Sequence, residues 1–235
     1  MNSPLLAALC ALAATATAAG PADAATRNFA ITSFDRVRID GPYKVQLATG
    51  IAPFANASGS AQALDGLAID VQGRTLVVHV NRSAWGGFSS QSPGLVTINL
   101  GTHDLSATWL NGSGSIAIDR VSGLSFDLSV QGSGLVSIDR VSVDQLRVGL
   151  GGAASARLAG TALRLNATVR GSSSLDAAAL AMKDVTIDAE GPAIVKGAVS
   201  DTAKVNALGV AAVTFTGSPA CIVKTQGSAT VEGCR

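Results

Sequence analysis

The sequence predicts an all-β fold, a parallel β-helix-like solenoid with about 20 residues per coil and an irregular β-rich N-terminal part. The first observation behind this prediction is a glycine followed by small residues that recurs through the second half of the chain. Self-similarity at a fixed period of this size is the signature of stacked repeats. Successive copies stand 18 to 20 residues apart, at Gly112, Gly132, Gly152, Gly171, Gly191, Gly209 and Gly227.

The second observation is an apolar column four residues after each glycine. Alternation of apolar and polar side chains with a period of two is the pattern of a β-strand with one buried face. Strands stacked about 4.8 Å apart would enclose a dry aliphatic interior. The positions between are mostly polar, whereas the column reads Ile116, Val136, Ala156, Leu175, Val195, Val213 and Val231.

The glycines and their Ser or Ala neighbours are interpreted as corners of the coils, because glycine reaches positive φ without steric cost. A phosphate-binding loop is the alternative interpretation of a Gly-Ser-Gly motif. It fails because no helical pattern follows any of these motifs, so no helix N-terminus is available for an anion. The motifs therefore predict architecture rather than a site.

In chain order, residues 1–24 come first and are predicted to be a secretory signal peptide. The run 5–19 is apolar and Ala-rich but too short to span a membrane, and small-residue cleavage sites follow at 16–18 and 22–24. The protein is therefore expected to be exported, to the periplasm, the cell surface or the medium, with no membrane span in the mature chain. Removing this segment leaves 17 Lys and Arg and 15 Asp and Glu, a formal charge of +2, which argues against nucleic acid as a partner.

Residues 25–235 are expected to form a single domain, with an irregular β base over 25–105 and regular coils over 106–235. A single helical turn is expected over 61–64, and a turn at Gln72-Gly73 is expected to join two strands. The base is interpreted as the lower end of the same solenoid, which it also caps. Strands in the base are expected over 34–40, 43–47, 53–58, 67–71, 75–80 and 95–100.

Two cysteines remain after residues 1–24 are removed, Cys221 and Cys234. A pair thirteen residues apart at the C-terminus of an exported protein is predicted to form a disulfide. The bridge would pin the last coil, which otherwise has an open edge. A metal site is the alternative, but two thiols with no nearby His lack the usual ligand set, and no metal or cofactor is expected.

Three stretches follow one another in an order that is familiar from one family. The stretch 34–43 reads FDRVRIDGPY, 73–78 reads GRTLVV, and 111–114 reads NGSG and opens the run of Gly-Ser coils. This order resembles the GIN domain, a family described as the "putative" head of auto-transporter adhesins. The resemblance covers the mature chain and implies a right-handed β-helix-like fold in exported bacterial proteins. It implies no catalytic residue, because the family has no established active site.

The most site-like segment is the Gly/Ser-rich stretch 81–94, which lies between two expected strands and contains Arg82, Trp85 and Phe88. Loops on a rigid scaffold often carry binding residues, and an exposed indole is a common platform for sugar rings or a partner surface. The alternative is that Trp85 and Phe88 fold back onto the end of the solenoid as a cap. If the loop is a site, its expected ligand is a glycan or a protein surface.

Two Ile-Asp-Arg-Val repeats place Asp119 and Asp139 on adjacent coils, about 4.8 Å apart. Retaining glycosidases hold their carboxylates about 5–5.5 Å apart, so this pair is the basis of an enzyme alternative. Against it, Ala159 takes the same position in the next coil, so no third carboxylate supports the pair. The adjacent arginines suggest a simpler role in neutralising a charge ladder, as Asp127 and Arg147 would do on the neighbouring face.

Taken together, these features predict a non-enzymatic, adhesin-like binding or structural module of the bacterial cell envelope. One alternative is a polysaccharide-active β-helix enzyme that uses Asp119 and Asp139. Another is a purely structural envelope protein whose outward columns make contacts in an assembly. No sequence feature specifies an oligomeric state.

Overall fold

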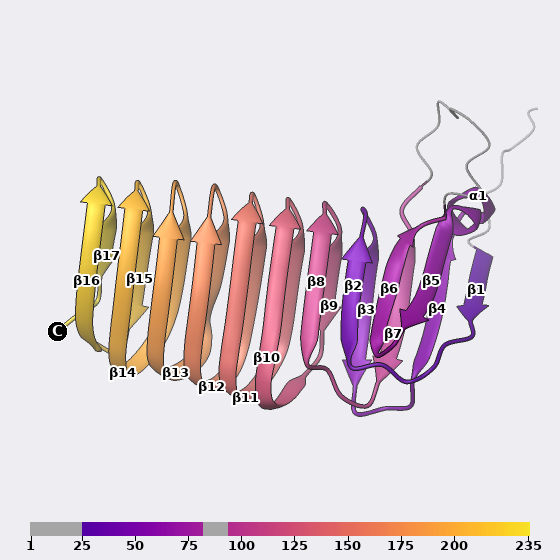
Figure 1. Ribbon diagram of the computed structural model, residues 1–235, viewed down its shortest axis with the longest axis horizontal. Helices are drawn as coiled ribbons and strands as arrows, with labels where there is room; N and C mark the ends of the chain where they lie inside the picture. The colour runs from indigo at the N-terminus through magenta and orange to yellow at the C-terminus, as the bar shows by residue number, and fades with distance from the viewer. Residues whose placement is uncertain (1–24, 82–93) are drawn as a thin grey trace, which may run out of the picture.

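The computed structural model describes residues 25–81 and 94–235. Its strands lie side by side along the long axis and form a β-solenoid of about six turns with about 20 residues per turn (Figure 1). The predicted fold class is therefore confirmed. The signal peptide expected over residues 1–24 lies outside the described residues, and the division of the chain into domains stays a prediction.

The seventeen described strands belong to one continuous sheet, and one short helix accompanies them. In chain order the elements are β1 (Ala25–Phe29), β2 (Arg36–Asp40), β3 (Lys44–Thr49), β4 (Phe54–Gly59), α1 (Ala61–Asp65), β5 (Leu67–Gln72), β6 (Thr75–Val80), β7 (Thr97–Thr102), β8 (Ala107–Gly112), β9 (Ser115–Ile118), β10 (Val121–Gly132), β11 (Leu135–Gly152), β12 (Ser155–Arg170), β13 (Ser174–Glu190), β14 (Ile194–Gly209), β15 (Ala212–Thr216), β16 (Ala220–Gly227) and β17 (Thr230–Glu232).

The core is built from columns of apolar side chains inside the solenoid. The long strands β10 to β14 pair in parallel with the equivalent strands of the adjacent coils, so equivalent residues stack on one another. The column predicted four residues after each glycine is buried from Ile116 to Val213. A second column starts at the fully buried Phe126 and continues through Leu146, Leu165, Val185, Ala203 and Cys221.

The recurring glycines form the corners along one edge of the solenoid, as predicted. Each adopts a positive φ, which is +74° at Gly171. A Cβ atom added to Gly171 would lie 2.6 Å from the carbonyl oxygen of Gly152 in the preceding coil. The corners therefore approach one another too closely for a side chain at Gly132, Gly152, Gly171 and Gly227. Gly41 extends this stack beyond Gly112, because a Cβ on Gly112 would lie 3.6 Å from the Gly41 Cα.

The coil formed by β2 and β3 is inserted between two segments that come later in the chain. β2 pairs in parallel with both β6 and β8, and β3 pairs in parallel with both β7 and β9. Figure 1 shows β2 and β3 between the β6–β7 coil and the β8–β9 coil. The order of coils along the stack therefore differs from their order along the chain.

The N-terminal end of the stack is closed by antiparallel strands and the helix. β5 pairs with β6, β4 with β7 and β1 with β4, all antiparallel. Helix α1 begins after Ser60, whose hydroxyl accepts a hydrogen bond from the Ala63 backbone N–H. Arg27 of β1 donates to the Leu64 carbonyl and to the Asp65 carboxylate. These contacts cover an edge that would otherwise be open to pairing with another chain.

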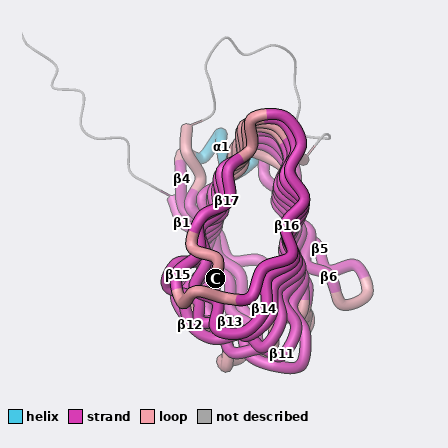
Figure 2. Tube along the Cα trace, turned by 90° about the vertical axis from the view of Figure 1, so that its left-hand side faces the viewer, coloured by secondary structure: helices cyan, strands magenta, loops and turns pink. Residues whose placement is uncertain are grey.

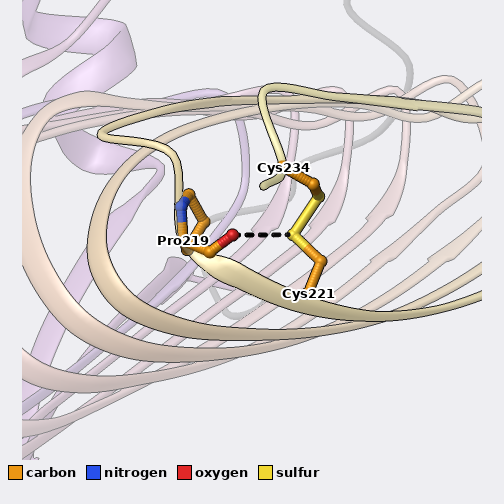
Figure 3. The surroundings of a disulfide bond; sticks show 3 residues. All are labelled: Pro219, Cys221 and Cys234. Carbon is orange, nitrogen blue, oxygen red and sulfur yellow. Dashed lines mark hydrogen bonds between the residues drawn. A yellow bond between two sulfur atoms is a disulfide. The ribbon is translucent and has the colours of Figure 1, made fainter.

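The C-terminal end of the stack is held by the predicted disulfide (Figure 3). Cys221 of β16 and Cys234 are bonded, with their Cα atoms 5.7 Å apart. The Pro219 carbonyl oxygen lies 3.6 Å from the Cys221 sulfur and accepts a hydrogen bond from the Arg235 backbone N–H at 3.1 Å. The bridge thus ties the end of the chain to the start of β16.

The last coil has no described neighbour on its outer side. Figure 2 looks along the stack from this end, with β16 and β17 on opposite sides of the end coil. Val223 occupies the same inward column as Val205, yet Val223 is 41% exposed whereas Val205 is buried. The last coil therefore has less packing energy than the interior coils.

Removing the disulfide by the double change Cys221→Ser and Cys234→Ser is expected to loosen the last coil. By the chain-entropy account, a disulfide that closes a loop of this size stabilises the folded state by about 3 kcal/mol. Few other contacts hold β17. Native-state hydrogen exchange should show faster exchange of β16 and β17 amides, with β11 and β12 amides unchanged as the internal control. Unchanged exchange in β16 would contradict the role given to the bridge.

Candidate ligand-binding groove

A surface groove of about 590 Å³ crosses five successive coils, from β11 to β15. Each coil contributes residues from the bend opposite the glycine corners. In β11 these are Ser142, Val143 and Asp144, which lie about midway between Gly132 and Gly152. Most of the wall residues are exposed, so the groove is open to solvent along its length. Its volume falls within the range of about 300–1,000 Å³ that is typical of small-molecule sites.

The groove runs across the strands because equivalent residues of each coil are held in register. The residues of one wall pair in parallel from coil to coil, and they are Ser142, Thr161, Ala181, Ala198 and Thr216. The register shifts next to this wall, between Ile138 and Val141 and between Ala177 and Ala181. Irregularities of this kind bend a strand and re-aim its side chains. We therefore attribute the hollow at this bend to them.

The floor of the groove is apolar. It consists of one column, each member of which is at most 6% exposed: Val143, Ala162, Met182 and Val199. Met182 is unbranched and polarisable, and such side chains adapt their shape to irregular contacts. The floor therefore offers van der Waals contact but no side-chain hydrogen-bonding group.

The second wall carries the charged groups of the groove. Leu163 is 44% exposed and stands between Asp144 of β11 and Lys183 of β13. Within residues 25–81 and 94–235, no carboxylate lies within 4.0 Å of the Lys183 ammonium group. Asp144 is two coils away, or about 9–10 Å at the usual strand spacing. Lys183 therefore presents a positive charge beside an apolar floor.

The three residues proposed from the sequence as a binding loop are Arg82, Trp85 and Phe88. All three lie outside the described residues, so the loop stays a prediction in both of its forms, a binding site or an end cap. The other tryptophan, Trp109 of β8, is half-buried on an outward face. It pairs with Arg38 on one side and with Ser129 on the other. Trp109 is thus a described aromatic platform that the sequence reasoning did not single out.

Asp119 and Asp139 occupy equivalent positions in adjacent coils, because Ile118 pairs with Ile138. The Asp119 carboxylate, however, accepts hydrogen bonds from two backbone N–H groups, that of Thr49 at 3.0 Å and that of Arg120 at 2.6 Å. It thereby fastens the end of β3 in the inserted coil to the corner after β9. This contact gives Asp119 a structural role that needs no partner carboxylate.

The ion pair expected between Asp127 and Arg147 forms, and a second outward pair joins Arg157 to Asp176. The Arg147 guanidinium lies 3.2 Å from the Asp127 carboxylate, and that of Arg157 lies 3.5 Å from Asp176. Both pairs are largely exposed and contribute at most about 1 kcal/mol each. Away from the groove, burial raises the pKa of the Tyr43 phenol above its ordinary value of 10.0.

No group of three or more His, Cys, Asp or Glu side chains in residues 25–81 and 94–235 is arranged to hold a metal ion. In the same ranges, no helix has the length and apolar character needed to cross a membrane.

Comparison with protein families gives one decisive match. The family model described as "Putative auto-transporter adhesin, head GIN domain" matches residues 33–219. The chain belongs to the GIN domain family. The groove lies wholly inside the part of this GIN domain that the family model matches, whereas Cys234 lies beyond it. The resemblance seen in the sequence motifs is therefore confirmed.

Solved structures share the fold of this GIN domain over nearly its whole length. A "putative adhesin" from Bacteroides fragilis superimposes with a TM-score of 0.82 at 17% identity, covering 89% of this chain and 96% of that one. A "putative lipid binding protein" from Parabacteroides distasonis superimposes with a TM-score of 0.74 at 19% identity, covering 91% of this chain and 97% of that one. A "putative adhesin" from Parabacteroides merdae superimposes with a TM-score of 0.64 at 18% identity, covering 91% of this chain and 97% of that one. At these identities the likeness shows the fold alone, and the comparison with curated proteins found no match.

Proposed function

We propose that this chain is an exported, non-enzymatic, adhesin-like binding module of the bacterial cell envelope that contacts its ligand through the groove across β11 to β15. The observation that carries the proposal is the apolar floor of that groove, an aligned column that continues through the coils of a rigid scaffold. Ligand sites are typically concave and mostly apolar with a few placed polar groups. Leu163 and Lys183 supply the exposed contacts beside this floor.

The comparisons support a binding role. The family is described as an adhesin head, and the structural relatives carry the names of a "putative adhesin" or a "putative lipid binding protein". An adhesin head works outside the cytoplasm, which agrees with the signal peptide proposed for residues 1–24 and with the disulfide at the C-terminus. The carboxylate pair of the enzyme alternative gains no support, because backbone N–H groups already engage Asp119.

A ligand panel tests this proposal. The chain is screened on a glycan array and against a set of single-chain lipids, beside the variant Leu163→Gln. The matched control is Leu124→Gln, because Leu124 is also exposed and lies in the same column on β10, but outside the groove. We expect at least one ligand whose binding falls about fivefold or more in Leu163→Gln, through lost apolar contact, and is unchanged in Leu124→Gln.

Two results would overturn the assignment of the groove. One is a ligand whose binding is unaffected by Leu163→Gln but lost in Trp109→Ala, which would move the site to the outward face of β8. The other is a panel without any ligand, together with a chain that fractionates as part of an envelope assembly, which would favour a purely structural role. Fractionation of cells also tests export, since recovery from the cytoplasm alone would contradict it.

A further inference from the structure

We propose that the groove binds a single-chain anionic amphiphile, with its hydrocarbon chain along the floor between Val143 and Val199 and its head group at Lys183. The inference rests on the proposed function, because it assigns a ligand class to the same groove. It follows from three properties of the groove, namely the apolar character of the floor, the length of the floor and the position of the charge.

The first property is the apolar character of the floor. Its four members pair in parallel from coil to coil and offer no side-chain hydrogen-bonding group: Val143, Ala162, Met182 and Val199. A peptide lying along the floor would bury its own backbone groups without partners, and a sugar would do the same with its hydroxyls. A hydrocarbon chain has no such groups. The groove therefore favours a ligand that is apolar along its length.

The second property is the length of the floor. The floor runs from Val143 of β11 to Val199 of β14, which is three spacings of about 4.8 Å, or about 14 Å in total. This is an extended channel rather than a compact pocket. A long, thin hydrocarbon chain can lie against the floor residues of successive coils, and each CH₂ group that it buries there adds to the binding.

The third property is the charge beside the floor. Lys183 projects from the middle coil of the groove, and in the described chain no carboxylate lies within 4.0 Å of its ammonium group. A carboxylate or phosphate head group would give this cation a charge-assisted hydrogen bond. Asp144 would repel the same head group near β11, so the anion is placed at Lys183 rather than at that end. The hydroxyl of Ser200, in the same wall on the next coil, already donates to the Asp201 carboxylate at 2.8 Å, so the head group is assigned to Lys183 alone.

The test is a titration of the full chain with hexadecanoate below its critical micelle concentration, compared with the uncharged hexadecanol. We expect hexadecanoate to bind more tightly than hexadecanol, and Lys183→Gln to weaken hexadecanoate binding by about tenfold while leaving hexadecanol binding unchanged. The control Lys204→Gln removes a charge from an exposed position of β14 outside the groove and should have no effect. Leu163→Gln should weaken the binding of both ligands, and Leu124→Gln should leave the binding of both unchanged. All four positions are exposed or partly exposed, so thermal unfolding of the variants should match that of the unchanged chain.

The outcomes separate the inference from the proposed function. Equal binding of both ligands, or hexadecanoate binding that Lys183→Gln leaves unchanged, would overturn the head-group assignment while the groove remains a site. If neither amphiphile binds while the binding of a panel ligand depends on Leu163, the inference fails and the proposed function stands. Binding to phosphatidylglycerol vesicles without binding of monomeric hexadecanoate would also overturn it, in favour of a membrane surface. If no ligand depends on Leu163, both proposals fail.

Discussion

Replacing Phe126 by alanine is expected to destabilise the protein by about 3–5 kcal/mol. The Phe126 side chain is fully buried and is among the largest such side chains in the core. It stacks in a column with Leu146 of the next coil. The backbone ladder fixes the spacing of the coils, so they cannot collapse into the cavity that the substitution leaves. Urea unfolding followed by circular dichroism measures the loss.

The matched control lies two residues earlier on the same strand. Leu124 is 79% exposed, so Leu124→Ala should change the free energy of unfolding by no more than about 0.5 kcal/mol. Similar losses in the free energy of unfolding for the two variants would contradict the assignment of Phe126 to the core. Both residues lie on β10, so the difference between the losses reports burial rather than strand propensity.

Replacing Gly171 by alanine is expected to destabilise the protein by about 2–5 kcal/mol. A residue with a side chain at φ +74° costs about 1–2 kcal/mol of conformational strain. The added Cβ would also lie 2.6 Å from the Gly152 carbonyl oxygen, a backbone atom that cannot move without disturbing the next corner. Overpacking of this kind typically adds about 1–3 kcal/mol. The loss is read from the same urea unfolding experiment.

Gly73 provides the control for this prediction. It also has a positive φ, +64°, in the turn between β5 and β6, but a Cβ built there meets nothing within 4 Å. Gly73→Ala should therefore cost the strain alone, about 1–2 kcal/mol. A loss as large as that of Gly171→Ala would show that the close stacking of the corners contributes little.

The regular coils could be predicted from the sequence because two signals agree there. The corner glycines repeat at nearly constant spacing, and the residue four positions later is always apolar. Both signals have one physical origin, since each coil repeats the environment of the coil below it. The same regularity predicted the ion pair between Asp127 and Arg147, which the register places side by side.

The inserted coil could not be predicted in the same way. β2 and β3 have the alternating pattern of any coil, and that pattern would also fit a stack in simple chain order. Their actual neighbours are fixed by pairing with β6 to β9, which are distant in sequence. The hydrogen bond from Thr49 to Asp119 is one sign of this placement, and no local sequence signal reveals it.

The groove escaped prediction for a different reason. Its residues do not keep a constant distance from the corner glycines, because the strands contain register shifts and the coils shorten. From the preceding corner glycine to the first wall, the offsets are 10, 9, 10, 7 and 7 residues, at Ser142, Thr161, Ala181, Ala198 and Thr216. An alignment at fixed period therefore separates residues that the structure brings together, among them Met182 and Lys183.

The most direct test of the groove as the ligand site uses Met182, which lies in its floor. The chain contains two methionines, Met1 and Met182, so selective ¹³C-methyl labelling gives a spectrum simple enough to assign with Met182→Leu. The chain is titrated with hexadecanoate and with each glycan that binds on the array. The account predicts a saturable shift of the Met182 methyl resonance with the ligand that binds. A ligand that binds while this resonance stays unchanged would contradict the account.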